Sequence, residues 1–173
     1  MIFIRRMLAL TIISLTVIYN QGCATLTHSQ ENTTTTIILT RHGERNAFAD
    51  DLNDKGRQRA KDLVKALEGI DISAIYCPNR SRNIDTATPL AEHLGLKVNI
   101  VDKSPSVSDL INTFLTKHAG KKILWVGNND NLSTMYSLLR GEGDPPVDYG
   151  DLFIIVIRDK GDPEIIKKTY GQH

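Results

Sequence analysis

The stretch that decides the fold is Thr40-Arg41-His42-Gly43-Glu44, which directly follows the apolar run Ile37-Ile38-Leu39. The apolar run predicts a strand, so the arginine and the histidine come where that strand ends. Open α/β sheets bind their ligands at the carboxyl ends of strands. A neutral histidine beside a cation can attack phosphorus, and the arginine can hold phosphoryl oxygens through charge-assisted hydrogen bonds. The glycine lets the chain turn tightly beneath such a ligand.

Outward from this stretch, segments with helical spacing of apolar residues alternate with short extended runs. Asn53 is expected to cap a first helix and Ser81 a second, in which Pro89 either bends the helix or moves its boundary to about Thr88. The remaining expected elements are a third helix that begins at Ser106 or Ser108, a fourth helix over 132–139, and strands over 72–76, 97–101, 123–126, 152–157 and 165–169.

This alternation of strands and helices, closed by two successive strands, indicates a three-layer α/β/α sandwich with a mostly parallel central sheet. The run 123–126 is apolar on both faces, which fits a strand at the centre of a sheet that helices cover on both sides. Three parallel strands would then deliver Arg41-His42, Arg82 and Asn128 to one edge of the sheet. The sequence therefore predicts a site that topology assembles from distant segments.

Further blocks make the chain resemble the histidine phosphatase superfamily, which includes the phosphoglycerate mutase-like phosphatases. The resemblance runs from about Thr35 to Gly171, and Arg82 stands four residues before Thr86, which is the family spacing. The blocks are Leu52-Asn53-Asp54-Lys55-Gly56-Arg57 at the start of the first helix, 74–82 with Thr86-Ala87 around the second arginine, Lys122-Ile123-Leu124-Trp125-Val126-Gly127 at the strand before the family's second histidine, and 149–157 with 168–171 at the last two strands.

The resemblance implies a phosphoglycerate mutase-like fold and hydrolysis of phosphomonoesters in two steps. A ring nitrogen of His42 would attack phosphorus in line, the alcohol would leave, and water would hydrolyse the phosphohistidine. Arg41 and Arg82 would clamp the phosphate. Glu44, counted here with the phosphate-binding residues, either orients His42 and tunes its basicity or forms a structural hydrogen bond in the turn.

One position departs from the family pattern. Where the family has Gly-His after the fourth strand, this chain has Gly127-Asn128. The Asn128 amide can still donate a hydrogen bond to a phosphate, but it lacks the positive charge of an imidazolium. Loss of one preorganised donor typically lowers a rate by about 10² to 10³. The fold prediction is unaffected, whereas an active phosphatase is expected to be a slower one.

Neither a general acid nor a cofactor site stands out. Asp102 is more simply a turn residue, and Asp109 is more simply the first-turn acid of a helix, where the helix dipole favours it. No pair of histidines, or histidine with carboxylate, has metal-ligand spacing, and the chain has no glycine-rich nucleotide loop. The sequence therefore predicts a site without cofactor or metal.

Composition sets the remaining bounds. With 173 residues, 40% of them hydrophobic, the chain is long enough for one domain with a proper core. A formal net charge of +1 and the lack of a long basic block give no electrostatic reason to expect nucleic acid as a partner. A phosphorylated small molecule or phosphate is the expected ligand.

The N-terminus has the pattern of a secretory signal. Arg5 and Arg6 precede an apolar stretch from Met7 to Tyr19, and Gly22-Cys23 resembles the end of a bacterial lipobox. The sequence therefore predicts a signal peptide over 1–22, lipid on Cys23, a threonine-rich tether over 23–34 and a phosphatase-like domain over 35–173. The expected location is the periplasm or cell envelope, with the lipid anchor as the contact with the membrane. Ordinary secretion or retention of the whole segment are the alternatives.

Three functions remain open from the sequence. The first is a phosphomonoesterase of reduced activity, because His42, Arg41 and Arg82 are present. The second is a degenerate module that binds phosphate or another anion without turnover, because Asn128 replaces a histidine. The third is a purely structural lipoprotein that reuses the fold.

Overall fold

The computed structural model describes residues 28–102 and 106–171 of the chain. The predicted signal peptide and the lipid-bearing Cys23 lie outside these residues. Within the described residues, no helix combines the length and the apolar character needed to cross a membrane. The last part of the predicted tether belongs to the domain, because Ser29 is buried and donates its backbone N–H to the Arg158 carbonyl at 2.9 Å, and Thr34 opens the first strand.

The elements follow the predicted order. Two of the predicted helix caps are observed, since the Asn53 side chain accepts from the Gly56 N–H and the Ser106 side chain accepts from the Asp109 N–H. The elements are β1 (Thr34–Arg41), α1 (Asp54–Ala66), β2 (Ala74–Pro78), α2 (Ser81–Leu94), β3 (Val98–Val101), α3 (Val107–Lys117), β4 (Lys122–Gly127), α4 (Asn129–Leu138), β5 (Asp151–Arg158) and β6 (Glu164–Thr169).

The strands form one mixed six-stranded sheet in the order β3-β2-β4-β1-β5-β6. Pairing is parallel from β3 through β2 and β4 to β1, and β5 runs antiparallel to both of its neighbours. The predicted α/β fold with a mostly parallel sheet is therefore confirmed. β4 lies inside the sheet between β2 and β1, as its two apolar faces predicted.

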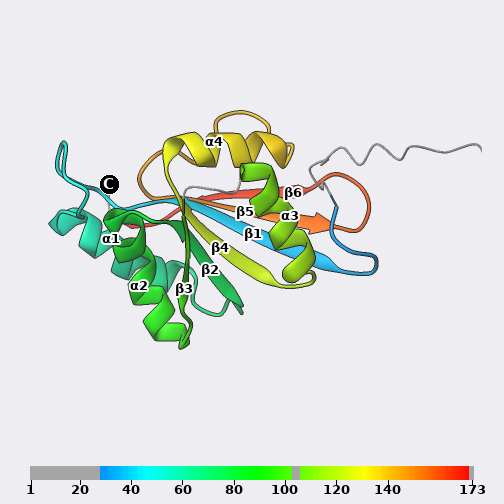
Figure 1. The fold of residues 1–173 in the computed structure, drawn as a ribbon, viewed down its shortest axis with the longest axis horizontal. Coiled ribbons are helices and arrows are strands. Elements are labelled where there is room, and N and C mark those ends of the chain that lie inside the picture. Colours follow the sequence, from blue (N-terminus) through cyan, green and yellow to red (C-terminus); the bar gives the residue numbers. More distant parts are fainter. Residues whose placement is uncertain (1–27, 103–105, 172–173) are drawn as a thin grey trace, which may run out of the picture.

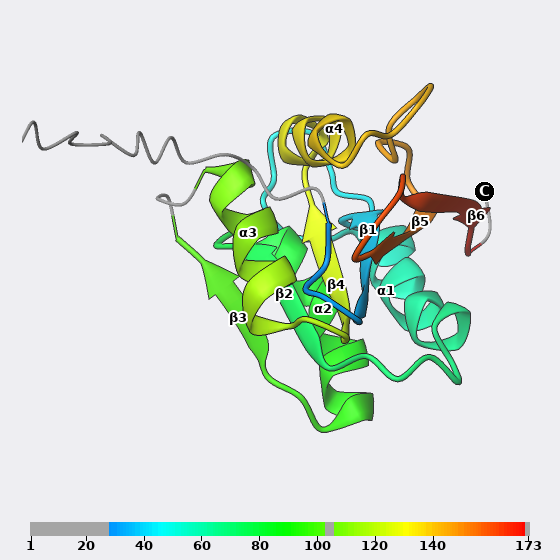
Figure 2. The same cartoon turned by 90° about the vertical axis from the view of Figure 1, so that its right-hand side faces the viewer.

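Helices cover both faces of the sheet, as Figures 1 and 2 show. α3 and α4 lie on one face, where Phe114 and Trp125 are among the buried side chains. α1 and α2 lie on the other face, where Leu63 and Leu90 are buried. The two cores make the three layers that the strand and helix pattern predicted.

The start of α2 differs from the prediction in its capping group. The sequence predicts Ser81 as the cap, but Ser81 is the first helical residue and Arg80 occupies the N-cap position without a side-chain bond. Asp50, from the loop before α1, accepts a hydrogen bond from the Ser81 N–H at 3.0 Å. The helix is thus capped by a residue distant in sequence, which a local pattern does not reveal. α2 continues through Pro89 to its end at Leu94.

The register of the central strands fixes the position of the site. Arg41 of β1 lies opposite Gly127 of β4, and the His42 N–H donates to the Gly127 carbonyl at 3.1 Å. His42 therefore follows β1 at the same edge where Asn128 follows β4. β2 pairs with the other side of β4 and leads into α2, whose first turn contains Arg82.

Candidate active site

The structure brings the predicted site residues to one edge of the sheet. Arg82 Nη2 donates to Asn128 Oδ1 at 3.3 Å. The positive charges of both Arg82 and Arg41 act on the His42 ring, which places all three side chains within electrostatic range of each other. Residues 41, 42, 82 and 128 thus share the carboxyl edge of β1, β2 and β4, although up to 87 positions separate them in the sequence.

His42 is buried and has distinct ring nitrogens. Its Nδ1 lies 2.7 Å from the Gly43 carbonyl oxygen. Because a carbonyl only accepts hydrogen bonds, Nδ1 carries the proton and Nε2 of the neutral ring carries the lone pair. Burial, the largest cause, and the charges of Arg82, Arg41 and Arg45 together lower the pKa of His42 to about 4, and the Gly43 carbonyl opposes this shift. The ring is therefore neutral at pH 7, as a nucleophile requires.

Arg41 is held by the segment that precedes β5. Its Nη1 donates to the Val147 carbonyl at 2.8 Å, and its Nη2 donates to the Tyr149 hydroxyl at 3.3 Å. The guanidinium carbon lies 4.0 Å from the centre of the Tyr149 ring, a cation–π distance. The same tyrosine ring meets the His42 ring edge-on, with 5.8 Å between the ring centres. Tyr149 therefore contacts both members of the Arg41-His42 pair.

Unpartnered polar atoms gather at this edge. In the part of the chain that the structure describes, the buried side-chain atoms without a hydrogen-bond partner are Arg41 Nε, Arg82 Nε and Asn83 Oδ1. An unsatisfied buried polar group costs about 1–3 kcal/mol, so such groups call for an explanation. Both Nε atoms are N–H donors on the arginines that are expected to clamp a phosphate. These two N–H groups are donors of the kind that bind phosphate oxygens.

The loop before α1 supplies an anion of its own. Asp50 Oδ1 forms an ion pair with Arg82 Nη1, while Asp50 Oδ2 accepts from the Ser81 N–H. Partial burial raises the pKa of Asp50, but the Ser81 amide and the Arg82 charge outweigh burial and lower it overall. Asp50 is thus a carboxylate at neutral pH. It occupies an arginine and a helix N-terminus, which are groups that bind phosphates in proteins.

Glu44 is engaged on the side of α1. Arg59 donates through Nε to Oε2 at 2.8 Å and through Nη2 to Oε1 at 2.5 Å. Burial raises the pKa of Glu44, but the Arg59 hydrogen bonds and charge lower it overall. Of the two roles that the sequence left open for Glu44, this geometry is the structural one, because both carboxylate oxygens bind Arg59.

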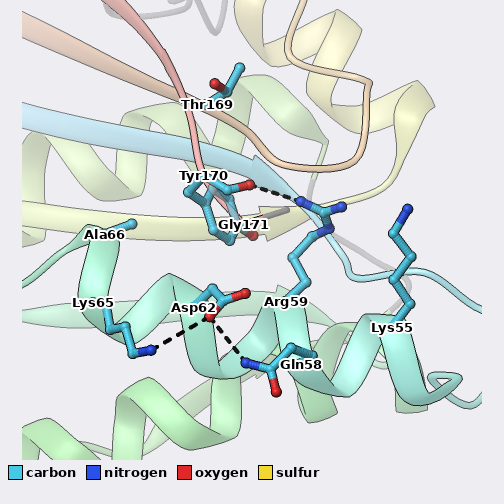
Figure 3. A pocket seen from close by; sticks show the side chains of 9 residues that line it. All are labelled: Lys55, Gln58, Arg59, Asp62, Lys65, Ala66, Thr169, Tyr170 and Gly171. Carbon is cyan, nitrogen blue, oxygen red and sulfur yellow. Dashed lines mark hydrogen bonds and ion pairs between the residues drawn. The ribbon is translucent and has the colours of Figure 1, made fainter. Parts of the chain in front are cut away.

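Arg59 also lines a pocket of about 860 Å³ between α1 and the end of β6. Figure 3 shows this pocket and the hydrogen bond from Arg59 Nη1 to the Tyr170 carbonyl oxygen, at 2.8 Å. Lys65 and Gln58 both reach the Asp62 carboxylate in its wall. None of residues 41, 42, 82 and 128 lines this pocket.

A second pocket, of about 490 Å³, adjoins the predicted site through Asn128. Asp102 lies in its wall, where its Oδ1 accepts from the Asn79 side chain at 2.6 Å. Asp109, the other acid considered from the sequence, belongs to the capping box of α3, as its first-turn position predicted. The full lining of this second pocket is Pro78, Asn79, Arg80, Val101, Asp102 and Asn128. Its size suits the part of a small substrate that extends beyond a phosphoryl group.

Sequence reasoning missed Asp50, Arg59 and the contact role of Tyr149. Asp50 meets Arg82 only because a loop folds back on α2, and no spacing rule signals that. Arg59 gave a weak sequence signal. A buried arginine needs an anionic partner, and Glu44 lies in the loop before the helix that contains Arg59. Tyr149 was noted only as the start of a strand block.

Comparisons with known proteins support the family resemblance. A sequence model of the histidine phosphatase superfamily (branch 1) matches residues 37–103, which include His42 and Arg82 but not Asn128. No protein with a curated description matches the sequence.

Solved structures share the fold at low sequence identity. YhfR of Bacillus stearothermophilus is 22% identical, with a TM-score of 0.61 over 76% of this chain and 95% of that one. A phosphoglycerate mutase from Bacillus anthracis is 16% identical, with a TM-score of 0.63 over 79% and 93%. The protein histidine phosphatase SixA complexed with tungstate is 14% identical, with a TM-score of 0.60 over 78% and 96%. These likenesses show the fold.

Proposed function

Because the chain belongs to the histidine phosphatase superfamily, by its match over residues 37–103 and by its fold, we propose that it is a phosphoric monoester hydrolase that works through a phosphohistidine at His42. The observation that carries the proposal is the state of His42, which is buried, neutral at pH 7 and left with a lone pair on Nε2. Arg41 and Arg82 are among the arginines within electrostatic range of it.

The chemistry follows from these groups. His42 Nε2 attacks phosphorus, the substrate oxygen leaves, and water then hydrolyses the N–P bond. Arg41 and Arg82 neutralise the phosphoryl oxygens, and their unpartnered Nε–H groups gain acceptors when the anion binds. The pocket beside Asn128 offers room for the leaving group. The tungstate complex of a structural neighbour is consistent with an oxyanion as ligand, because tungstate is tetrahedral like phosphate.

Asn128 and Asp50 both argue for a modest rate. Asn128 contributes a neutral donor where the family has a histidine, which typically costs about 10² to 10³ in rate. Asp50 must also leave Arg82, or share it, before a phosphate can bind fully.

Trapping of the phosphoenzyme tests the proposal. Brief incubation with a ³²P-labelled aryl phosphate is expected to give acid-labile, alkali-stable label on the native chain and none on His42→Ala. Asn128→His is expected to raise turnover by about 10² to 10³. Absence of label from both the native chain and Asn128→His would refute the hydrolase.

The Asp50–Arg82 ion pair supports a second candidate, a module that binds phosphate or another anion without turnover. A protein of this kind would bind phosphate or vanadate in calorimetry while failing the trapping experiment. Asp50→Asn is expected to tighten the binding and Arg82→Ala to weaken it. If no anion binds and Arg82→Ala changes nothing, this candidate fails.

The location is proposed from the N-terminus alone. We propose that the mature domain is held at a membrane of the cell envelope by lipid on Cys23 and meets phosphorylated small molecules there. Residue 23 lies outside the described residues, so the pattern Gly22-Cys23 carries this proposal by itself.

A further inference from the structure

A phosphomonoester hydrolase must supply a proton to the leaving oxygen, and the carboxylates of Glu44, Asp50 and Asp102 near this edge already have partners. Both oxygens of Glu44 accept from Arg59. Asp50 pairs with Arg82 and is charged at neutral pH. Asp102 accepts a hydrogen bond from a neighbouring asparagine. Glu44 and Asp50 are each paired with an arginine and have no proton to give, which directs the search for the donor to the other side chains that contact Arg41 and His42.

The Tyr149 side chain carries a hydroxyl and contacts both Arg41 and His42. Its ring meets the edge of His42 at 5.8 Å between ring centres, and its oxygen accepts from Arg41 Nη2 at 3.3 Å. That hydrogen bond leaves the hydroxyl proton free to point elsewhere, since the tyrosine oxygen is the acceptor in it. Tyrosine is one of the side chains that serve as general acids in enzymes.

The turn that carries Tyr149 is held by contacts on both sides of the tyrosine in the sequence. Arg41 holds the Val147 carbonyl, and the Asp148 and Asp151 backbones are linked by the bond from the Asp151 N–H to the Asp148 carbonyl at 3.2 Å. Gly150 has φ of +92°, and a Cβ at this position would collide with Arg59 Nη1. Such a turn places the tyrosine hydroxyl without any rearrangement, which is what a preorganised catalytic group requires.

We propose that the Tyr149 hydroxyl is the proton donor to the leaving group, an assignment that rests on the proposed hydrolase. As Nε2 of His42 bonds to phosphorus and the bond from phosphorus to the leaving oxygen breaks, the Tyr149 proton moves to that oxygen and a neutral alcohol departs. Arg41 stabilises the tyrosinate, because it already donates to the same atom. In the second step the tyrosinate takes a proton from water, the water oxygen bonds to phosphorus, and the N–P bond breaks, which restores both side chains.

Tyr149→Phe isolates the hydroxyl, because the ring that contacts Arg41 and His42 is kept. We would measure kcat/KM for a series from 2,4-dinitrophenyl phosphate through phenyl phosphate to an alkyl phosphate. The variant is expected to match the native protein within about threefold on the dinitrophenyl ester, whose leaving group needs no proton, and to lose about 10² to 10³ on the phenyl and alkyl esters.

The chain offers a matched control. Tyr76 is another half-buried tyrosine, and its hydroxyl lies 2.8 Å from His118 Nε2 in the packing between β2 and α3. Tyr76→Phe is therefore expected to change kcat/KM by the same small factor across the series. A merely structural effect of losing a tyrosine hydroxyl would look like this control.

Two further results would overturn the assignment. If Tyr149→Phe loses the same factor on every ester, or loses nothing, the hydroxyl does not protonate the leaving group, although label on His42 would leave the hydrolase itself standing. If 2,4-dinitrophenyl phosphate leaves no label on His42 of the native chain, the hydrolase fails and the role of Tyr149 fails with it.

Discussion

At the residue scale, the two nitrogens of His42 have separate tasks. Nδ1 is tied to the Gly43 carbonyl, which fixes the ring and its tautomer, and Nε2 is left to react. Burial and the neighbouring arginines lower the pKa of His42, so the ring stays neutral at pH values where an ordinary histidine is protonated. The cations that would bind the phosphate thus also prepare the nucleophile.

The pH dependence of the free protein tests this state of His42. Because burial lowers the pKa of His42 to about 4, the nucleophile is lost only as the pH falls through that value. We expect an NMR titration of the His42 ring to have its midpoint near 4, and kcat/KM, corrected for substrate ionisation, to be flat from pH 7 to 5.

Arg82→Met is expected to raise this midpoint, because the charge of Arg82 is one of the causes that lower it. A midpoint at or above 6 in the native protein would mean that His42 is exposed to water and that its pKa is not lowered as proposed.

Single residues also show how far the sequence reaches. His42 could be chosen from its place after an apolar strand, and Arg82 and Asn128 from the family resemblance. Parallel topology then explains why the three meet, because it sends strand ends to one edge. Asp50 could not be chosen, because its contact with Arg82 depends on the path of a loop. Tyr149 had no pattern of its own either.

At the scale of elements, α1 and the loop after β1 are built to touch. A Cβ on Gly43 would lie 2.7 Å from the Gly56 carbonyl oxygen, and a Cβ on Gly56 would collide with the Glu44 carbonyl oxygen. Two glycines at the contact therefore let the helix approach the loop that carries His42. Across the same contact Arg59 of α1 holds Glu44.

Removal of Arg59 should weaken the contact between α1 and the loop after β1 and lower the free energy of unfolding. Arg59→Leu leaves the buried Glu44 carboxylate with only the exposed Lys55 at 3.6 Å, and loss of a buried partner typically costs about 3–5 kcal/mol in the free energy of unfolding. Urea denaturation at pH 7 measures this loss. The pKa of Glu44 is lowered in the folded protein, so the contribution of the pair is present above the ordinary pKa of glutamate and disappears as the pH falls through the lowered value. The two proteins should therefore converge in stability towards pH 3.

Arg57→Leu is the matched control on the same helix, since the Arg57 side chain is 58% exposed, its ion-pair partner Asp54 is fully exposed, and its other bond goes to the Leu52 carbonyl. It should change the free energy of unfolding by less than about 1 kcal/mol. Equal effects of the two substitutions would mean that the Arg59–Glu44 pair holds nothing in place.

Element boundaries were predictable where a local signal exists. Asn53 and Ser106 cap their helices through their own side chains, as their positions before apolar periodic segments indicated. The start of α2 was not predictable in the same way, because its cap comes from Asp50. Pro89 lies within α2, so a proline alone did not mark a boundary.

At the scale of the whole molecule, the sequence predicts an N-terminal signal peptide followed by a tether and a domain. The pattern Gly22-Cys23 at the end of this signal peptide predicts lipid on Cys23. The chain has one other cysteine, Cys77. Cys77 is buried at the end of β2, and burial raises the pKa of its thiol to about 12, which makes it unreactive.

Metabolic labelling with palmitate in a bacterial host tests the predicted lipidation of Cys23. The native chain is expected to take up label and to sediment with membranes, whereas Cys23→Ser should lose the label and keep its precursor length. Cys77→Ser is the control and should be labelled like the native chain. Label that persists in Cys23→Ser, or a native chain that is never labelled, would contradict a lipoprotein.

The order of elements along the chain and the central position of the strand over 123–126 came from the apolar pattern. The order β3-β2-β4-β1-β5-β6 and the antiparallel direction of β5 came only from the structure. The way in which α1 and the 46–51 loop lie against the site was beyond the sequence. Those contacts form between residues that are distant in sequence, such as Glu44 and Arg59, and they exist only once the chain has folded.

The single tryptophan of the chain gives this edge a built-in optical reporter. Trp125 Nε1 donates to Asn131 Oδ1 at 3.1 Å, and the same oxygen accepts from the Asn128 N–H at 2.9 Å. Any oxyanion that pulls on Asn128 changes the electric field at a buried indole, so the emission wavelength should report occupancy without a dye, a label or a chemical turnover.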